Sequence, residues 1–131
     1  MKRIRMTEHW RIPVDRVILL ASIGVGLAIT VGSLMPGPPV PDVENGDKLM
    51  HLGGYAALAA CWSLALTGRR GYVLLGSMLF GVLIECLQGL TPYRSFDMMD
   101  MLANGCGALL GTALMQLAAP FLDRRTRSHA S

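Results

Sequence analysis

Charged residues are absent from several long stretches of this chain, and those stretches divide it into apolar segments. No Asp, Glu, Lys or Arg occurs in residues 17–41, 49–68, 71–84, 86–93 and 101–122. A helix needs about 20 mostly apolar residues to cross a hydrocarbon layer ~30 Å thick, and several of the stretches reach that length. The pattern predicts an all-α polytopic membrane protein, a bundle of four transmembrane helices over about 17–35, 47–67, 72–90 and 96–122.

Proline and glycine mark the connections between these helices. Four prolines and an Asn-Gly pair between residues 36 and 46 predict a stiff loop outside the membrane. A tight turn at 68–71 follows the second helix, Thr91-Pro92 ends the third, and Ser95 is a candidate N-cap for the fourth. On the first helix, a spacing of four predicts a small-residue face for close packing: Gly24, Ala28 and Gly32. The whole chain, 1–131, then forms a single membrane domain.

The composition agrees with a membrane domain and excludes other classes. Of the 131 residues, 52% are hydrophobic and 16% are charged, whereas soluble domains contain about 25% charged residues. The net charge of +3 comes without an aromatic-interleaved basic stripe or a Gly-rich phosphate loop, so we expect no nucleic-acid partner. The first apolar segment is longer than the ~7–15-residue core of a signal peptide and lacks a small-residue cleavage site, so we expect it to stay uncleaved.

The distribution of Lys and Arg predicts the orientation of the helices. Five lie before the first helix, two in the 68–71 connection and three after the fourth helix. The two connections on the opposite side carry one each, Lys48 and Arg94. Because cytoplasmic loops carry the excess of Lys and Arg, both termini are expected in the cytoplasm of a multi-pass protein.

With that orientation, the polar residues that are unusual for a membrane lie at the outer ends of the helices: Asp47, Lys48, His51, Tyr55, Glu85, Gln88, Arg94, Asp97, Asp100 and Asn104. Asp47, His51 and Tyr55 follow one another at intervals of four residues, so they share one face of the second helix. Asp97, Asp100 and Asn104 share one face of the fourth helix in the same way. We therefore expect these helix ends to converge on one polar pocket that opens outward.

Some of these residues also have an ordinary structural explanation. Asp47 could cap the second helix, and Asp97 could interact with the positive N-terminus of the fourth. A single histidine at a helix entrance is more often a structural hydrogen-bonding group than a ligand. Glu85 is harder to explain, because an ionised carboxylate in hydrocarbon costs on the order of 3 kcal/mol. It must be neutral, wetted by a cavity or paired with Arg94, Lys48 or His51.

The same residues resemble the VanZ-like family, named after an accessory protein of teicoplanin resistance. The matching motifs are Ser33-Leu34-x-Pro36, Asp47-Lys48-x-x-His51 with Tyr55, Glu85-x-x-Gln88, Arg94-Ser95-Phe96-Asp97-x-x-Asp100-x-x-Ala103-Asn104, and Gly107-x-x-x-Gly111. They cover residues 33–111, and their order and gaps make the set specific. The resemblance implies a small protein of the bacterial plasma membrane with these residues as its signature. It links the chain to glycopeptide tolerance only through the family, whose biochemical activity is poorly defined.

One hypothesis is an enzyme at the outer leaflet that acts on a lipid-linked or cell-envelope substrate. Glu85 and His51, the latter oriented by Asp47, would form the catalytic acid/base set. Arg94 and Lys48 would hold an anionic headgroup, and the remaining polar residues would orient the substrate: Tyr55, Gln88, Asp97, Asp100 and Asn104. No local metal signature occurs, so no metal is assigned, although Asp97, Asp100, Glu85 and His51 are acceptable ligand types for a divalent cation. No other cofactor is indicated.

A second hypothesis is a non-enzymatic binder or transporter of an anionic lipid-linked intermediate or amphiphile. The same charges would then form a headgroup site, and four short helices would favour a homo-oligomer. A purely structural polar cluster is the third alternative, but interhelical polar contacts in membranes contribute only ~0.6 kcal/mol each. The sequence does not decide between these roles.

Overall fold

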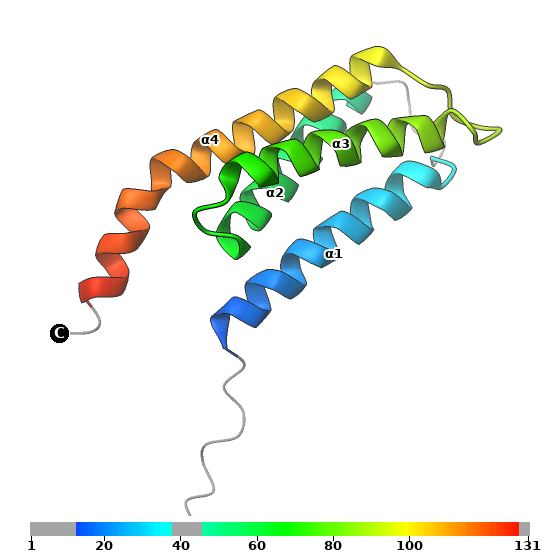
Figure 1. Cartoon of the computed structure of the whole chain (residues 1–131). Helices are drawn as coiled ribbons and strands as arrows, with labels where there is room; N and C mark the ends of the chain where they lie inside the picture. Colours follow the sequence, from blue (N-terminus) through cyan, green and yellow to red (C-terminus); the bar gives the residue numbers. More distant parts are fainter. Residues whose placement is uncertain (1–12, 38–45, 129–131) are drawn as a thin grey trace, which may run out of the picture.

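The computed structural model describes residues 13–37 and 46–128 and contains four helices in this part of the chain. They are α1 (Val14–Leu34), α2 (Gly46–Ala65), α3 (Arg70–Gln88) and α4 (Met98–Ser128). The all-α fold class is therefore confirmed. Consecutive helices run in opposite directions, so the α3–α4 connection lies at the same end as the C-terminus of α1 and the N-terminus of α2 (Figure 1). The basic residues before residue 13 and the prolines at 38, 39 and 41 lie outside the described residues.

Three of these helices are long and apolar enough to cross a membrane. They are α1, α3 and residues 98–122 of α4, with mean hydropathies of 2.3, 1.6 and 1.5. Helix α2, which carries Asp47 and Lys48 in its first turn and buries His51 and Ser63, is not among them. Within the described residues, these three helices indicate a membrane protein.

Helices α2 and α4 share the most extensive interface of the bundle. Gly107 and Gly111 of α4 lie directly against the backbone of α2, where an added Cβ would overlap the carbonyl groups of Leu52 and Ala56. Ala108, on the same side of α4, is fully buried. Small residues let two helix backbones approach closely, and this approach determines where the polar residues at the helix ends meet.

Helix α1 packs more loosely than the sequence predicts. An added Cβ at Gly24 or Gly32 would meet nothing within 4 Å in the described part of the chain, so the expectation that this small-residue face packs closely is wrong there. Ser22 is the single buried residue of the helix. Its hydroxyl donates to the Ile18 carbonyl of the same helix, so a polar group in an apolar segment is satisfied without a neighbouring helix.

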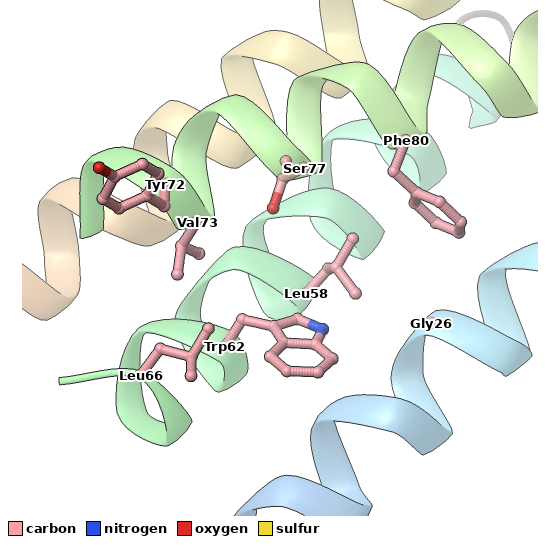
Figure 2. A pocket seen from close by; sticks show the side chains of 9 residues that line it. Gly26, Leu58, Trp62, Leu66, Tyr72, Val73, Ser77 and Phe80 are labelled. Carbon is pink, nitrogen blue, oxygen red and sulfur yellow. The ribbon is translucent and has the colours of Figure 1, made fainter. Parts of the chain in front are cut away.

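Two hollows separate α1 from the other helices. The more apolar one has a volume of about 250 Å³ and lies between α1, α2 and α3, with Leu58, Trp62, Val73 and Phe80 among its lining residues (Figure 2). The second has a volume of about 350 Å³ and reaches the end of the bundle that carries the polar residues. We call this second hollow the α1–α2 groove. It is the larger of the two, and it combines apolar with charged lining residues.

The start of α4 differs from the prediction. The helix begins at Met98, and the Asp97 carboxylate accepts a hydrogen bond from the Met99 backbone N–H over 2.8 Å. Asp97 therefore caps the helix, and the expectation that Ser95 does so is wrong. An aspartate is a good N-cap because its carboxylate satisfies a backbone N–H that has no partner within the helix. At its other end α4 continues past residue 122 to Ser128.

Candidate functional site

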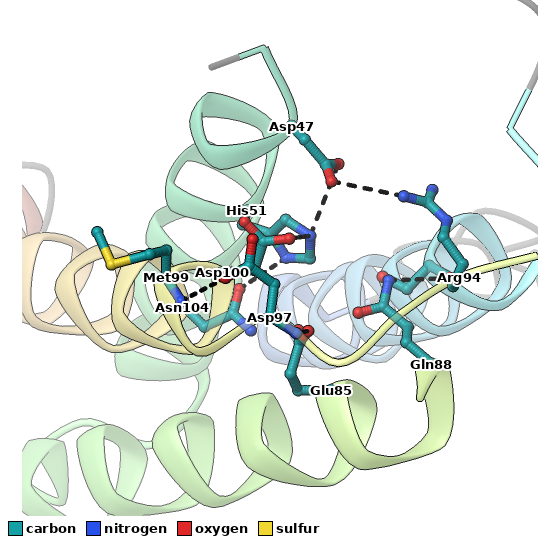
Figure 3. A network of polar contacts seen from close by, with 10 residues as sticks. Asp47, His51, Glu85, Gln88, Arg94, Asp97, Met99, Asp100 and Asn104 are labelled. Atoms are coloured by element: carbon teal, nitrogen blue, oxygen red, sulfur yellow. Dashed lines mark hydrogen bonds and ion pairs between the residues drawn. The ribbon is translucent and has the colours of Figure 1, made fainter. Parts of the chain in front are cut away.

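Most of the predicted polar residues meet at one end of the bundle, and Figure 3 shows eight of the ten. Helix α2 supplies His51 and Tyr55, the end of α3 supplies Glu85 and Gln88, and the following connection supplies Arg94 and Asp97. Asp100 and Asn104 come from the first turns of α4. Six members of this group are buried: His51, Tyr55, Glu85, Gln88, Asp100 and Asn104. The convergence that the helical spacing predicts is therefore present in the described residues.

His51 of α2 lies at the centre of the group, and its ring contacts side chains of α2 and of α4 (Figure 3). Its Nδ1 donates a hydrogen bond to the Asn104 side-chain oxygen over 2.9 Å. Its Nε2 faces two carboxylates, with Asp100 Oδ2 at 3.5 Å and Asp47 Oδ1 at 3.7 Å. The hydrogen bond to Asn104 fixes the ring orientation, so Nε2 is the nitrogen directed at the carboxylates.

Arg94 and Asp47 form the more exposed side of the group. The Arg94 Nη1 lies 3.5 Å from Asp47 Oδ2, and 54% of the Asp47 side chain is exposed. At that exposure the ion pair contributes little to stability, so another anion can compete for the guanidinium. Lys48 is half-buried and forms no ion pair with any residue in the described ranges.

Glu85 has a partner that the sequence did not indicate. Its Oε1 accepts a hydrogen bond from the Asp97 backbone N–H over 2.7 Å, and the residue is fully buried. Within residues 13–37 and 46–128 it forms no ion pair, and Arg94, one of its three expected partners, pairs with Asp47 instead. Glu85 therefore attaches the start of α4 to α3, since it binds a backbone N–H just before the first helical turn.

Two further contacts attach the C-terminus of α1 to this region. The Gln88 side-chain amide donates to the Ser33 carbonyl over 3.0 Å, and the Tyr93 hydroxyl donates to the Leu34 carbonyl over 2.8 Å. The last carbonyls of a helix have no partner within it, so these bonds satisfy groups that would otherwise need water. Tyr93 was not a predicted site residue, and nothing in its local sequence distinguishes it from an ordinary interfacial aromatic.

Several buried polar atoms of the group have no hydrogen-bond partner in the described part of the chain: Tyr55 Oη, Glu85 Oε2, Asp100 Oδ1 and Asn104 Nδ2. An unpaired buried polar atom costs about 1–3 kcal/mol, so such atoms are rare in folded proteins and usually have a reason. Four of these atoms lie in this one cluster.

The α1–α2 groove connects this polar group to an apolar wall. Five predicted site residues line it: Asp47, His51, Tyr55, Gln88 and Arg94. The rest of the lining is mainly apolar, and Val25, Ala28 and Ile29 of α1 contribute to it. The groove therefore offers an apolar surface that ends at charged and hydrogen-bonding side chains.

Comparison with known proteins identifies the family. The VanZ/LLP1 family model matches residues 6–119, which is most of the chain. The chain belongs to the VanZ/LLP1 family. The predicted VanZ-like resemblance is thereby confirmed, and every polar residue described above falls within the matched region. A search of curated proteins and a search of solved structures found no match.

Proposed function

We propose that this VanZ/LLP1 protein binds an amphiphile with an anionic headgroup, a membrane lipid or a lipid-linked cell-envelope precursor, in the α1–α2 groove. The observation that carries the proposal is the two-part lining of the groove. Val25, Ala28 and Ile29 offer an apolar wall to a hydrocarbon chain, while Arg94 and His51 stand at its polar end. Binding sites for small molecules combine apolar walls with a few placed polar groups in this way.

Arg94 is the residue best suited to hold the headgroup. A guanidinium matches phosphate and carboxylate groups with two parallel hydrogen bonds. The Arg94 side chain is 26% exposed, and its partner Asp47 is more exposed still. A headgroup phosphate can therefore approach Arg94 without first breaking a buried ion pair.

The proposal places the polar end of the groove at the outer leaflet of the bacterial plasma membrane. Helix α1 ends at the polar end of the bundle, and α3 begins at the opposite end. Helix α2 therefore runs from the polar end to the opposite end. With 20 residues it is about 30 Å long, enough to make a fourth crossing. Both termini then lie on the cytoplasmic side, in agreement with the excess of Lys and Arg there.

Catalysis on the bound amphiphile is the second candidate function, and the environment of His51 favours it. The Nε2 atom belongs to a residue that lines the groove and lies within 3.7 Å of two carboxylates. A histidine held by a hydrogen bond on one nitrogen can transfer a proton through the other. In this version Glu85 positions α4, and the headgroup lies between His51 and Arg94.

Lipid binding in nanodiscs tests the first proposal. The purified protein is offered phosphatidylglycerol, a polyprenyl phosphate or phosphatidylcholine, and retained lipid is measured by native mass spectrometry. We expect preferential retention of an anionic lipid, and Arg94→Ala should weaken it about tenfold, since a hydrogen bond to a charged group is worth about 1.5–3 kcal/mol. Arg70→Ala is the matched control, because Arg70 bonds Gln116 at the opposite end of the bundle.

The outcomes separate the two functions and the two kinds of lipid. Equal retention of anionic and neutral lipid, or equal retention by Arg94→Ala and the unaltered protein, would refute the headgroup site. Retention of polyprenyl phosphate over phosphatidylglycerol would identify a lipid-linked precursor as the ligand. A covalent change in the retained lipid that disappears in His51→Ala, while the lipid itself is still bound, would establish catalysis.

A further inference from the structure

We propose that Asp47, His51 and Asp100 form a binding site for a divalent transition-metal ion of the Zn²⁺ type. Each residue offers one ligand atom, and these three atoms lie within 4.8 Å of one another. The residues come from two helices, with Asp47 and His51 one turn apart on α2 and Asp100 in the first turn of α4. This set differs from the cation ligands that the sequence suggested, because it includes Asp47 and leaves out Glu85 and Asp97.

The two distances from His51 Nε2 to the carboxylates fit a bridging ion better than direct hydrogen bonds. A hydrogen bond between a charged nitrogen and a carboxylate is about 2.7–2.9 Å long, whereas His51 Nε2 lies 3.5 Å from Asp100 and 3.7 Å from Asp47. Zinc binds nitrogen and oxygen ligands at about 2.0–2.2 Å in tetrahedral geometry, which places any two ligand atoms roughly 3.4 Å apart. The spacing around Nε2 is close to that value.

The surroundings of the histidine are those of a metal ligand. Metal-binding histidines almost always donate their other ring N–H to a second protein group, which fixes the ring. Here Nδ1 donates to Asn104, a residue that is 1% exposed. The nitrogen left for an ion is therefore the one that faces the two carboxylates.

Asp100 supplies an independent indication of a ligand. Its side chain is only 9% exposed, and its second oxygen, Oδ1, has no hydrogen-bond partner in the described part of the chain. A buried carboxylate without adequate partners is costly. A divalent cation at this position compensates the Asp100 carboxylate, while Asp47 also has the Arg94 guanidinium beside it.

The ligand types also restrict the ion. Mg²⁺ and Ca²⁺ prefer oxygen ligands, while an imidazole together with carboxylates suits Zn²⁺ and similar ions. Three protein ligands leave a fourth position for water or another ligand. Asp47 and His51 also line the α1–α2 groove, so a headgroup oxygen could occupy that position. This last step rests on the proposed function, whereas the metal site itself does not.

Metal binding is tested on the full-length protein in nanodiscs, after treatment with a chelator and without added anionic lipid. Zn²⁺ binding is measured by equilibrium dialysis with elemental analysis, and Mg²⁺ is the comparison ion. We expect one Zn²⁺ per chain and at least a tenfold loss of affinity in His51→Ala and in Asp100→Asn. Asp97→Asn is the matched control, because the Asp97 carboxylate lies outside the donor set and asparagine is an equally good N-cap.

Thermal unfolding with and without Zn²⁺ keeps the test valid if a variant is less stable. The unaltered protein and Asp97→Asn should unfold at a higher temperature when Zn²⁺ is present, because a ligand that binds the folded state stabilises it. Asp100→Asn should show no such shift. The inference is overturned if the unaltered protein binds no Zn²⁺, or if Asp97→Asn loses as much affinity as Asp100→Asn. Since lipid retention is measured separately, either proposal can fail while the other stands.

Discussion

Gly107 is where a single added methyl group should disturb both the fold and the site. In Gly107→Ala the new Cβ would overlap the Leu52 carbonyl oxygen, and it would lie 3.0 Å from the carbonyl carbon and 3.1 Å from the Ala56 nitrogen. All three atoms are backbone atoms of α2, so no side chain can rotate out of the way. The two helices must instead move apart.

The size of the effect follows from these contacts. Non-bonded carbon atoms pack at about 3.5–4.0 Å, so α2 and α4 must separate by roughly 0.5–1 Å. Such overpacking costs about 1–3 kcal/mol, while replacing a helical glycine by alanine returns about 0.5–1 kcal/mol. The expected net loss of unfolding free energy is therefore up to about 2.5 kcal/mol. Asn104 is one turn away on the same face of α4, so its 2.9 Å hydrogen bond to His51 should lengthen as well.

Gly105→Ala is the matched control, because an added Cβ there meets nothing closer than the flexible end of Met78, at 3.9 Å. It should stabilise the protein by about 0.5–1 kcal/mol through helix propensity. The assay is denaturant unfolding in detergent micelles followed by circular dichroism. If Gly107→Ala proves as stable as Gly105→Ala, the close approach of α2 and α4 is wrong, and so is the site geometry that depends on it.

Three further predictions test the site and the topology. Glu85→Gln should keep α4 attached to α3, because the amide oxygen can still accept a hydrogen bond from the Asp97 N–H. Glu85→Ala should lower the unfolding free energy by about 1–3 kcal/mol. Equal losses of unfolding free energy in the two variants would contradict the positioning role of Glu85. Tyr93→Phe removes the hydrogen bond to Leu34 and should lower the unfolding free energy by about 0.6 kcal/mol, while Tyr72→Phe, whose residue is 77% exposed, should have no effect. In a protein whose Cys61, Cys86 and Cys106 are replaced by serine, Tyr93→Cys should react with a membrane-impermeant reagent added outside the cell and Thr67→Cys should not. The reverse result would invert the proposed orientation.

The polar group contains two sets of residues that differ in their contacts. Glu85, Gln88 and Tyr93 bind backbone groups of neighbouring segments, so they hold the helix ends together. His51, Asp47 and Arg94 instead contact other ionisable side chains. The first set is therefore expected to influence stability, and the second is expected to influence what the protein binds.

Much of this arrangement could be predicted from the sequence. Long stretches without charge predict helices, because a backbone in hydrocarbon must satisfy its own hydrogen bonds. Helical periodicity also placed Asp47, His51 and Tyr55 on one face and Asp97, Asp100 and Asn104 on another. These are properties of single helices, so no knowledge of the neighbouring helices is needed.

The partners of these residues depended on the tertiary structure. Spacing shows which side chains share a face, but it does not show which face of the next helix they meet or at what distance. Glu85 therefore binds the Asp97 backbone N–H, which is not one of the three basic partners that the sequence offered, and the predicted small-residue face of α1 remains open among the described residues. The close contact of α2 and α4 at Gly107 and Gly111 sets the separation of the two helices. That separation brings His51 of α2 to Asp100 and Asn104 of α4, because side chains on different helices can meet only where their backbones allow it.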